Sequence, residues 1–131
     1  MVKKWIVVLS IITLLAVGCT LEYDFVNREF HTLEQKLEIY KTMLDETEDH
    51  VAIAENVEYI DDVHTYWHEK NKVLKSLIWH TGLKDIEVGM ARIKTYVEEN
   101  DYTEALTELE SLIYYVTHYA DDFKISFENI L

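Results

Sequence analysis

The sequence contains no proline, and its only glycines are Gly18, Gly82 and Gly89. Because proline and glycine most often end helices, their scarcity removes the usual interruptions of helical structure. Leucine, glutamate, lysine and alanine, which favour helices, are plentiful. The composition predicts an all-α protein, and a length of 131 residues allows one domain.

Cysteine is nearly absent as well, because Cys19 is the only one in the chain. No disulfide can therefore form within the domain that follows it. We expect that domain to be held together by packing alone.

Basic residues are scarce: 12 lysines and arginines stand against 25 aspartates and glutamates, for a formal net charge of −13. Neither lysine nor arginine occurs between Lys41 and Lys70, where acidic residues accumulate. A phosphate backbone would be repelled by such a surface, so nucleic acid is not an expected partner. The acidic stretch suits a basic protein face or loosely held cations, and plain solvation of the charges is the alternative.

The chain has one long hydrophobic run, at its N-terminus. After two lysines it is apolar from Trp5 to Val17 and reaches Cys19 through a glycine, a pattern typical of an export signal. The ending Leu15-Ala16-Val17-Gly18-Cys19 resembles the lipobox of bacterial lipoproteins, in which the cysteine is lipidated and becomes the new N-terminus. Three residues before the cysteine the lipobox prefers leucine, whereas this sequence has Ala16 at that position.

Two forms of membrane attachment follow. In the first, residues 1–19 are a lipoprotein-type signal peptide and Cys19 carries the lipid. In the second, the segment remains as an uncleaved anchor, since the 17 residues of Trp5–Leu21 just suffice to cross a bilayer core of about 30 Å. By the positive-inside bias, the lysines before the run place residues 20–131 outside the cytoplasm. We expect a helical domain at 20–131 on the outer face of the cell membrane.

Apolar residues recur at steps of three and four along the rest of the chain, which predicts four helices. The expected ranges are about Asp24–Leu44, Asp49–Trp79, Leu83–Asn100 and Asp101–Ile130. In the second helix Trp67 is the expected core anchor, and the polar residues His64 and Asn71 interrupt the apolar positions.

Turns are predicted near 45–48, 80–82 and 100–101. Asp45 and Asp101 can accept hydrogen bonds at the start of a helix, and Gly82 suits the left-handed position at the end of one. Because short turns join antiparallel neighbours, we expect an antiparallel four-helix bundle of two helical hairpins behind the N-terminal membrane-targeting segment.

The residues from Trp67 to Leu131 resemble a known family. The similarity is carried by Trp67, Leu74, Leu77-Ile78-Trp79-His80, Leu83, Ile86-Glu87, Ala91-Arg92-Ile93-Lys94, Tyr96, Asn100-Asp101, Glu104-Ala105 and Ser126-Phe127-Glu128-Asn129-Ile130-Leu131. The family consists of short, membrane-anchored helical proteins of low-GC Gram-positive bacteria and is known as a domain of unknown function. The resemblance implies a tethered helical domain and no known activity.

His64 and His68 lie four residues apart with Asp61 one turn earlier, so they could share one face of a helix. Two imidazoles at that spacing can bind one divalent metal ion. The interior glutamate of the zinc-protease motif is missing, and so are the two Glu-x-x-His pairs of a di-iron bundle. The alternative is that these histidines simply face solvent or the edge of the apolar positions.

No serine, cysteine or lysine has the flanking base or glycine-rich turn that nucleophilic or phosphate chemistry requires. We therefore expect neither an enzyme nor a cofactor. The expected function is a non-catalytic binding module that meets another envelope protein through Glu55, Glu58, Asp61 and Asp62. A metal-binding bundle using His64 and His68 is the alternative.

Overall fold

The fold was obtained as a computed structural model, which describes residues 1–75 and 80–130, with side chains for residues 1–75, 82–119 and 121. These residues form four α-helices and one short 3₁₀-helix, and no strand occurs among them. The α-helices are α1 (Val2–Glu46), α2 (Ala54–Leu74), α3 (His80–Glu98) and α4 (Tyr102–Ile130), and the 3₁₀-helix is Glu48–His50. The all-α prediction is confirmed.

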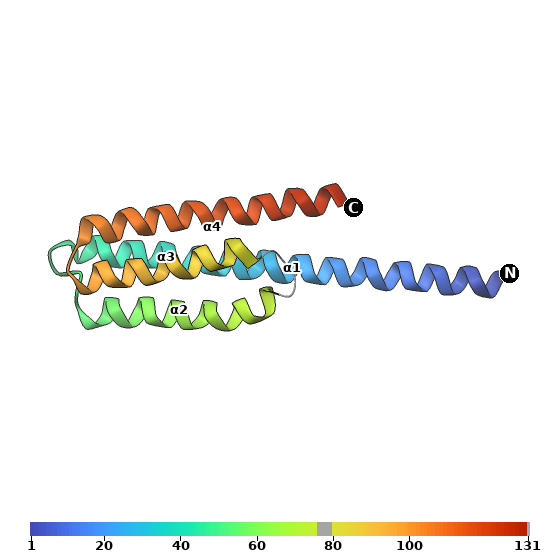
Figure 1. Cartoon of the computed structure of the whole chain (residues 1–131), viewed down its shortest axis with the longest axis horizontal. Coiled ribbons are helices and arrows are strands. Elements are labelled where there is room, and N and C mark those ends of the chain that lie inside the picture. Colours follow the sequence, from blue (N-terminus) through green and yellow to red (C-terminus); the bar gives the residue numbers. More distant parts are fainter. Residues whose placement is uncertain (76–79, 131) are drawn as a thin grey trace.

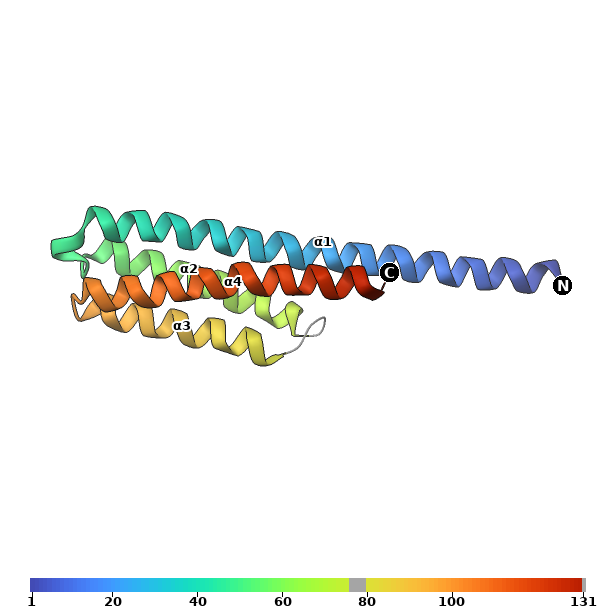
Figure 2. The same ribbon diagram turned by 90° about the horizontal axis from the view of Figure 1, so that it is seen from above.

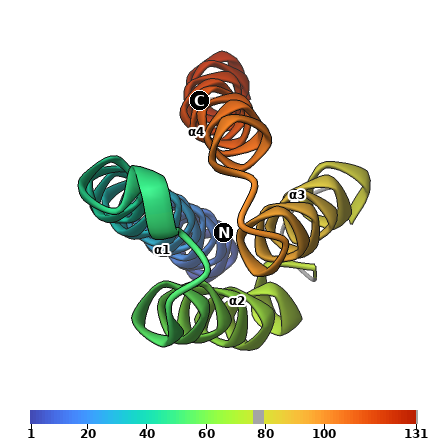
Figure 3. The same cartoon turned by 90° about the vertical axis from the view of Figure 1, so that its left-hand side faces the viewer.

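The four helices form an antiparallel bundle (Figures 1 and 2). Seen end-on in Figure 3, α1 lies between α2 and α4, and α3 completes the square, so every helix packs against its neighbours in sequence and α1 also packs against α4. The α1–α2 and α3–α4 connections lie at one end, called here the distal end. The N-terminal part of α1 projects from the opposite, proximal end (Figure 1).

The bundle core consists of the apolar residues that recur at steps of three and four. On α1 and α3 every predicted core position is fully buried: Val26, Phe30, Leu33, Leu37, Tyr40, Leu44, Leu83, Ile86, Met90, Ile93 and Val97. Such spacing keeps one stripe of a helix turned toward its partners, so the sequence pattern translates directly into burial.

Trp67 is fully buried, as predicted, and is part of a line of aromatic rings across the core. Its ring lies edge-on to Phe30 of α1, with centroids 5.2 Å apart, and Phe30 stacks on Tyr119 of α4 at 5.1 Å. Edge-to-face and offset-stacked rings add to the stability gained from burial alone. Three helices are thereby joined through one set of contacts.

The N-terminal apolar run and the first bundle helix are one continuous helix, which corrects the prediction that the first helix begins near Asp24. Helix α1 starts at Val2 and continues for 45 residues. No proline interrupts it, and nothing lies within 4 Å of the position that a Cβ would take on Gly18, so this glycine faces open space within the helix.

The second helix begins later than predicted, since α2 covers Ala54–Leu74 and the prediction began at Asp49. Its start is set by Asn56, which is buried and whose side-chain amide donates to Val51 O at 2.9 Å and to Thr47 Oγ1 at 2.8 Å. These bonds hold the preceding residues outside the helix. The predicted part from residue 76 to 79 lies outside the described residues.

The predicted turn at 45–48 is confirmed, although its proposed cap is wrong. Helix α1 ends at Glu46, but the Asp45 carboxylate accepts a hydrogen bond from the Tyr102 hydroxyl at 2.7 Å instead of capping a helix. The predicted turn at 100–101 is confirmed together with its cap, because Asp101 Oδ1 accepts the backbone N–H of Glu104 at 3.1 Å.

Asn100 lies two residues beyond the end of α3 and has the left-handed conformation, with φ 58°. The N–H of Asn100 donates to Val97 O, and the N–H of Asp101 donates to Tyr96 O at 2.8 Å. This pair of bonds is the Schellman arrangement, which satisfies carbonyls left open at a helix end.

The predicted turn at 80–82 is wrong, because α3 already begins at His80 and Gly82 lies inside it. Gly82 does not have the positive φ of a cap residue. Its role is close packing: a Cβ at Gly82 would overlap the Tyr119 ring and lie 2.9 Å from the Tyr115 hydroxyl oxygen. Gly89, seven residues on, likewise faces Leu112, so both glycines let α4 approach α3.

Gly82→Ala should therefore destabilise the bundle. Alanine is the better helix former by about 1 kcal/mol, but overpacking costs about 1–3 kcal/mol, and the stacked Tyr119 ring has little room to move. Urea denaturation of the full chain in detergent should show a lower midpoint for Gly82→Ala. The control Gly18→Ala adds a Cβ where nothing lies within 4 Å, and an equal loss in both variants would refute the close-packing explanation.

Candidate functional site

The N-terminal segment exposes a continuous apolar surface. Its large hydrophobic side chains are all exposed, including Trp5, Ile12 and Leu14, and none of the most apolar stretch is buried in the bundle. By length and composition α1 can cross a membrane or act as a signal anchor. Cys19 lies within α1 with a partly exposed side chain.

The distal end is fixed by contacts between its two connections. The side-chain oxygen of Asn100 accepts the backbone N–H of Ala52 at 3.2 Å, and the Tyr102 hydroxyl donates to Asp45. The hydrogen bond to Asp45, together with partial burial and nearby carboxylates, raises the pKa of Tyr102 to about 12. The α1–α2 and α3–α4 connections therefore present one surface.

This surface is strongly acidic, and we call it the acidic end. Its members are exposed or half-exposed carboxylates from all four helices and their connections: Asp45, Glu46, Glu48, Asp49, Glu55, Glu58, Asp62, Glu98, Glu99, Asp101 and Glu104. The sequence pointed to the acids between Lys41 and Lys70 only. Folding adds those of the α3–α4 connection, which are about fifty residues away along the chain.

The four predicted partner-binding residues do not all lie in the same surroundings. Glu55, Glu58 and Asp62 are exposed. Asp61 is half-buried, and its carboxylate lies 2.7 Å from the Lys94 ammonium of α3. Both carboxylates near Lys94, those of Asp61 and Glu98, raise the pKa of this lysine. Asp61 is thus engaged within the bundle, whereas the other three are open to a partner.

Two of the three predicted metal ligands are engaged with residues of α3. His68 Nδ1 lies 3.1 Å from Glu87 Oε1 on α3, and Asp61 pairs with Lys94 instead. His64 is half-buried, while Val63 takes the fully buried position. No group of three His, Cys, Asp or Glu side chains that could hold a metal ion occurs among the described residues.

Glu87 joins α2 to α3 through a polar contact that the sequence did not reveal. The buried Asn71 side chain donates to Glu87 Oε1 at 2.9 Å, which confirms Asn71 as a buried polar residue on the second helix. Burial alone would raise the pKa of the Glu87 carboxyl, but hydrogen bonds from Asn71 and His68 and the charges of His68 and His64 hold it below its usual value.

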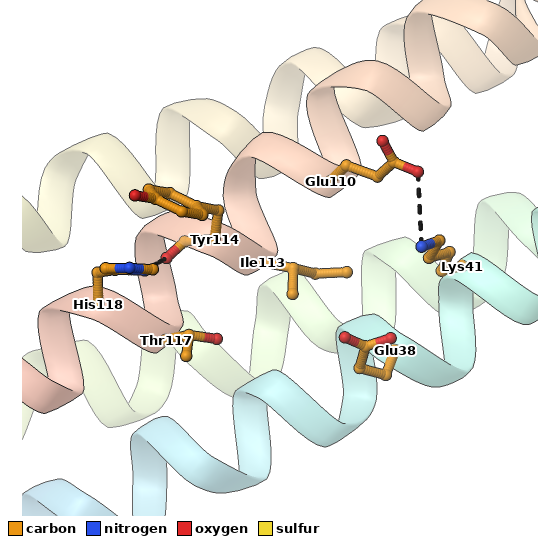
Figure 4. A pocket seen from close by; sticks show the side chains of 7 residues that line it. All are labelled: Glu38, Lys41, Glu110, Ile113, Tyr114, Thr117 and His118. Carbon is orange, nitrogen blue, oxygen red and sulfur yellow. Dashed lines mark hydrogen bonds and ion pairs between the residues drawn. The ribbon is translucent and has the colours of Figure 1, made fainter.

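A second surface feature is a shallow groove between α1 and α4, with a volume of about 500 Å³ (Figure 4). Its lining residues are Glu38, Lys41, Glu110, Ile113, Tyr114, Thr117 and His118. Lys41 and Glu110 form an ion pair at 3.5 Å, and the exposed Tyr114 ring stacks on His118 with centroids 3.8 Å apart. No local sequence pattern predicts this groove, because its residues come from two helices that are distant in the chain.

These observations define a class: an antiparallel four-helix bundle with an apolar extension of its first helix at one end and a carboxylate surface at the other. The chain belongs to the family described as a domain of unknown function (DUF4363), whose model matches residues 22–130. No curated protein and no solved structure matches it. The predicted membership of an uncharacterised family is confirmed, and the bacterial origin and lipoprotein signal stay predictions.

Proposed function

We propose that the protein is a non-catalytic binding module held at the membrane by its N-terminal segment, on the extracytoplasmic side. The observation that carries this proposal is the exposed apolar surface on the N-terminal part of α1. The helix itself continues from this part into the bundle without a break. Such a surface is stable only against lipid or another apolar partner. Two lysines before the run favour an outer location for the bundle.

The N-terminal segment could attach the protein in either of two ways: through a lipid on Cys19 after cleavage, or as an uncleaved membrane helix. Labelled palmitate in a bacterial host distinguishes them. Label that is lost in Cys19→Ala supports the lipoprotein, whereas an unlabelled chain that retains residues 1–18 by mass spectrometry supports the anchor.

The surface that meets the partner is the acidic end, and the partner is an envelope protein with a basic face. Glu55, Glu58 and Asp62 support this because they are exposed and, in the described part of the chain, no lysine forms an ion pair with them as Lys94 does with Asp61. Complementary charge steers association and fixes orientation more than it adds affinity. We do not extend the proposal to a metal site at His64 and His68, because no observation favours it.

A zero-length carbodiimide crosslink tests this proposal, since it joins a carboxylate directly to a lysine in contact with it. Crosslinking in native membranes should yield a defined adduct of the wild-type chain. Glu58→Lys combined with Asp62→Lys should remove most of that adduct, because both charges at the contact are reversed.

The matched control is Glu22→Lys combined with Asp121→Lys, which reverses two exposed acids near the proximal end. This control should keep the adduct. Equal adduct in the distal variant and the wild type would rule out the acidic end as the contact surface.

A further inference from the structure

Lysines gather at the proximal end on α2 and α3, and this distribution mirrors the acidic end. Lys70, Lys72 and Lys75 lie at the end of α2, and Lys84 lies near the start of α3; all four are exposed or half-exposed. We call them the proximal lysines. Between Glu69 and Asp85 the sequence has no acidic residue.

The end of α2 and the start of α3, which carry these lysines, lie at the end of the bundle from which the apolar part of α1 projects (Figures 1 and 2). Side chains of α2 near this end contact α1 close to the point where α1 enters the bundle. Lys70 Nζ lies 3.7 Å from Glu29 Oε1, and the Trp67 ring packs against Phe30. Glu29 follows Leu21 by eight residues, or about 12 Å of helix. The proximal lysines are therefore close to the level at which the apolar surface ends.

On both helices a lysine lies nearer to the proximal end than any acid. Lys75 lies six residues beyond Glu69, about 9 Å at 1.5 Å per residue, and Lys84 precedes Asp85 and Glu87. A separation of about 9 Å is close to the Debye length of about 8 Å at physiological ionic strength. A charged surface at this end therefore interacts with Lys75 more strongly than with Glu69 behind it, whereas Lys84 lies only one residue, about 1.5 Å of helix rise, from Asp85.

We propose that the proximal lysines contact the phosphate groups of anionic lipid headgroups. This inference rests on the proposed membrane attachment. Each lysine close to an anionic bilayer adds to the electrostatic attraction, so a few lysines suffice to orient a bundle that is already attached.

The contact is one-sided. At the proximal end α1 and α4 carry the exposed acids Glu22, Asp24 and Asp121, and the proximal lysines lie on the neighbouring pair α2 and α3. An anionic bilayer attracts one half of this end and repels the other. The bundle accordingly leans so that α2 and α3 approach the headgroups.

The test uses the full chain in lipid nanodiscs of phosphatidylcholine, with or without phosphatidylglycerol, and measures the acylation rate of each lysine by mass spectrometry. Lys72, Lys75 and Lys84 should react several-fold more slowly in the anionic discs. The effect should vanish at about 1 M salt, where the screening length is about 3 Å. Lys41 and Lys94 serve as internal references, because Lys94 pairs with Asp61 and Lys41 lies with Glu110 toward the distal end.

A charge variant sharpens the test. Lys72→Glu combined with Lys75→Glu should abolish the protection of Lys84 in anionic discs, whereas the control Lys41→Glu should leave it unchanged. Equal rates for the proximal lysines in both kinds of disc, with the chain incorporated, would overturn the headgroup contact but leave membrane attachment standing. A chain that does not incorporate into either disc would overturn both.

Discussion

Replacing Ile12 and Leu14 together with lysine should remove the chain from the membrane fraction. Both side chains are exposed near the middle of the apolar run. A lysine at the centre of a membrane-inserted helix costs about 2.5–3.5 kcal/mol, so the pair costs about 5–7 kcal/mol. That cost lowers the inserted population by about four powers of ten. The loss is expected for an anchor and for a signal peptide alike.

The chain offers a matched control for this experiment. Ile39 is 54% exposed and Ile12 is 56% exposed, so the two isoleucines differ in place rather than in burial. Ile39→Lys combined with Val88→Lys alters two exposed apolar residues of the bundle and should leave the chain in the membrane fraction. If the Ile12 and Leu14 variant resists an alkaline wash as well as the wild type does, the N-terminal segment is not the attachment.

Trp67→Ala should lower the free energy of unfolding by about 3–5 kcal/mol. The indole is fully buried and touches Phe30, which in turn stacks on Tyr119, so truncation leaves a cavity where three helices meet. Since a domain of this size has a total stability of about 5–15 kcal/mol, the variant loses a large share of it. Urea denaturation of the full chain in detergent measures the loss.

Two further variants test whether the lost stability comes from removing a buried aromatic ring at position 67. Trp67→Phe keeps an aromatic ring against Phe30 and removes an indole N–H that has no hydrogen-bond partner in the described part of the chain, so it should lose much less stability than the alanine variant. Tyr114→Ala truncates an aromatic residue that is 65% exposed and should change stability by less than about 0.5 kcal/mol. A midpoint for Trp67→Ala equal to that of Tyr114→Ala would contradict the role of Trp67 in the core.

The helix pattern could be predicted from the sequence wherever local spacing alone decides burial. The core positions of α1 and α3 followed from steps of three and four residues, and the turn at 100–101 with its Asp101 cap followed from cap chemistry within a few residues. These features depend on neighbours in the chain. They can therefore be predicted from the sequence without a structure.

The errors arose where a specific side-chain contact, rather than the helical spacing of apolar residues, decides the outcome. The start of α2 depends on the bonds of Asn56 to Val51 and Thr47, and the position of Gly82 inside α3 depends on the Tyr115 and Tyr119 side chains of α4. Glycine suits a helix cap and a close helix contact equally well. The sequence therefore could not choose between them.

The same limit applies to the candidate site. Acid content identified α2 as a negatively charged helix, and Glu55, Glu58 and Asp62 are indeed exposed. The pairing of Asp61 with Lys94, and of His68 with Glu87, requires the register of α3 against α2, which no local pattern contains. A signal for Glu87 was nonetheless present, because it lies within the stretch that resembles the family.

The continuous α1 helix sets a standoff distance between the acidic end and the bilayer. From Leu21, where the apolar run ends, to Glu46 the helix rises for 25 residues, or about 37 Å. A straight helix cannot be shortened, so a binding partner anchored in the same bilayer needs a stalk or domain that places its basic face at that height. In an uncleaved anchor, with no joint along α1, a tilt of the membrane segment would also swing the acidic end sideways through an arc of that radius.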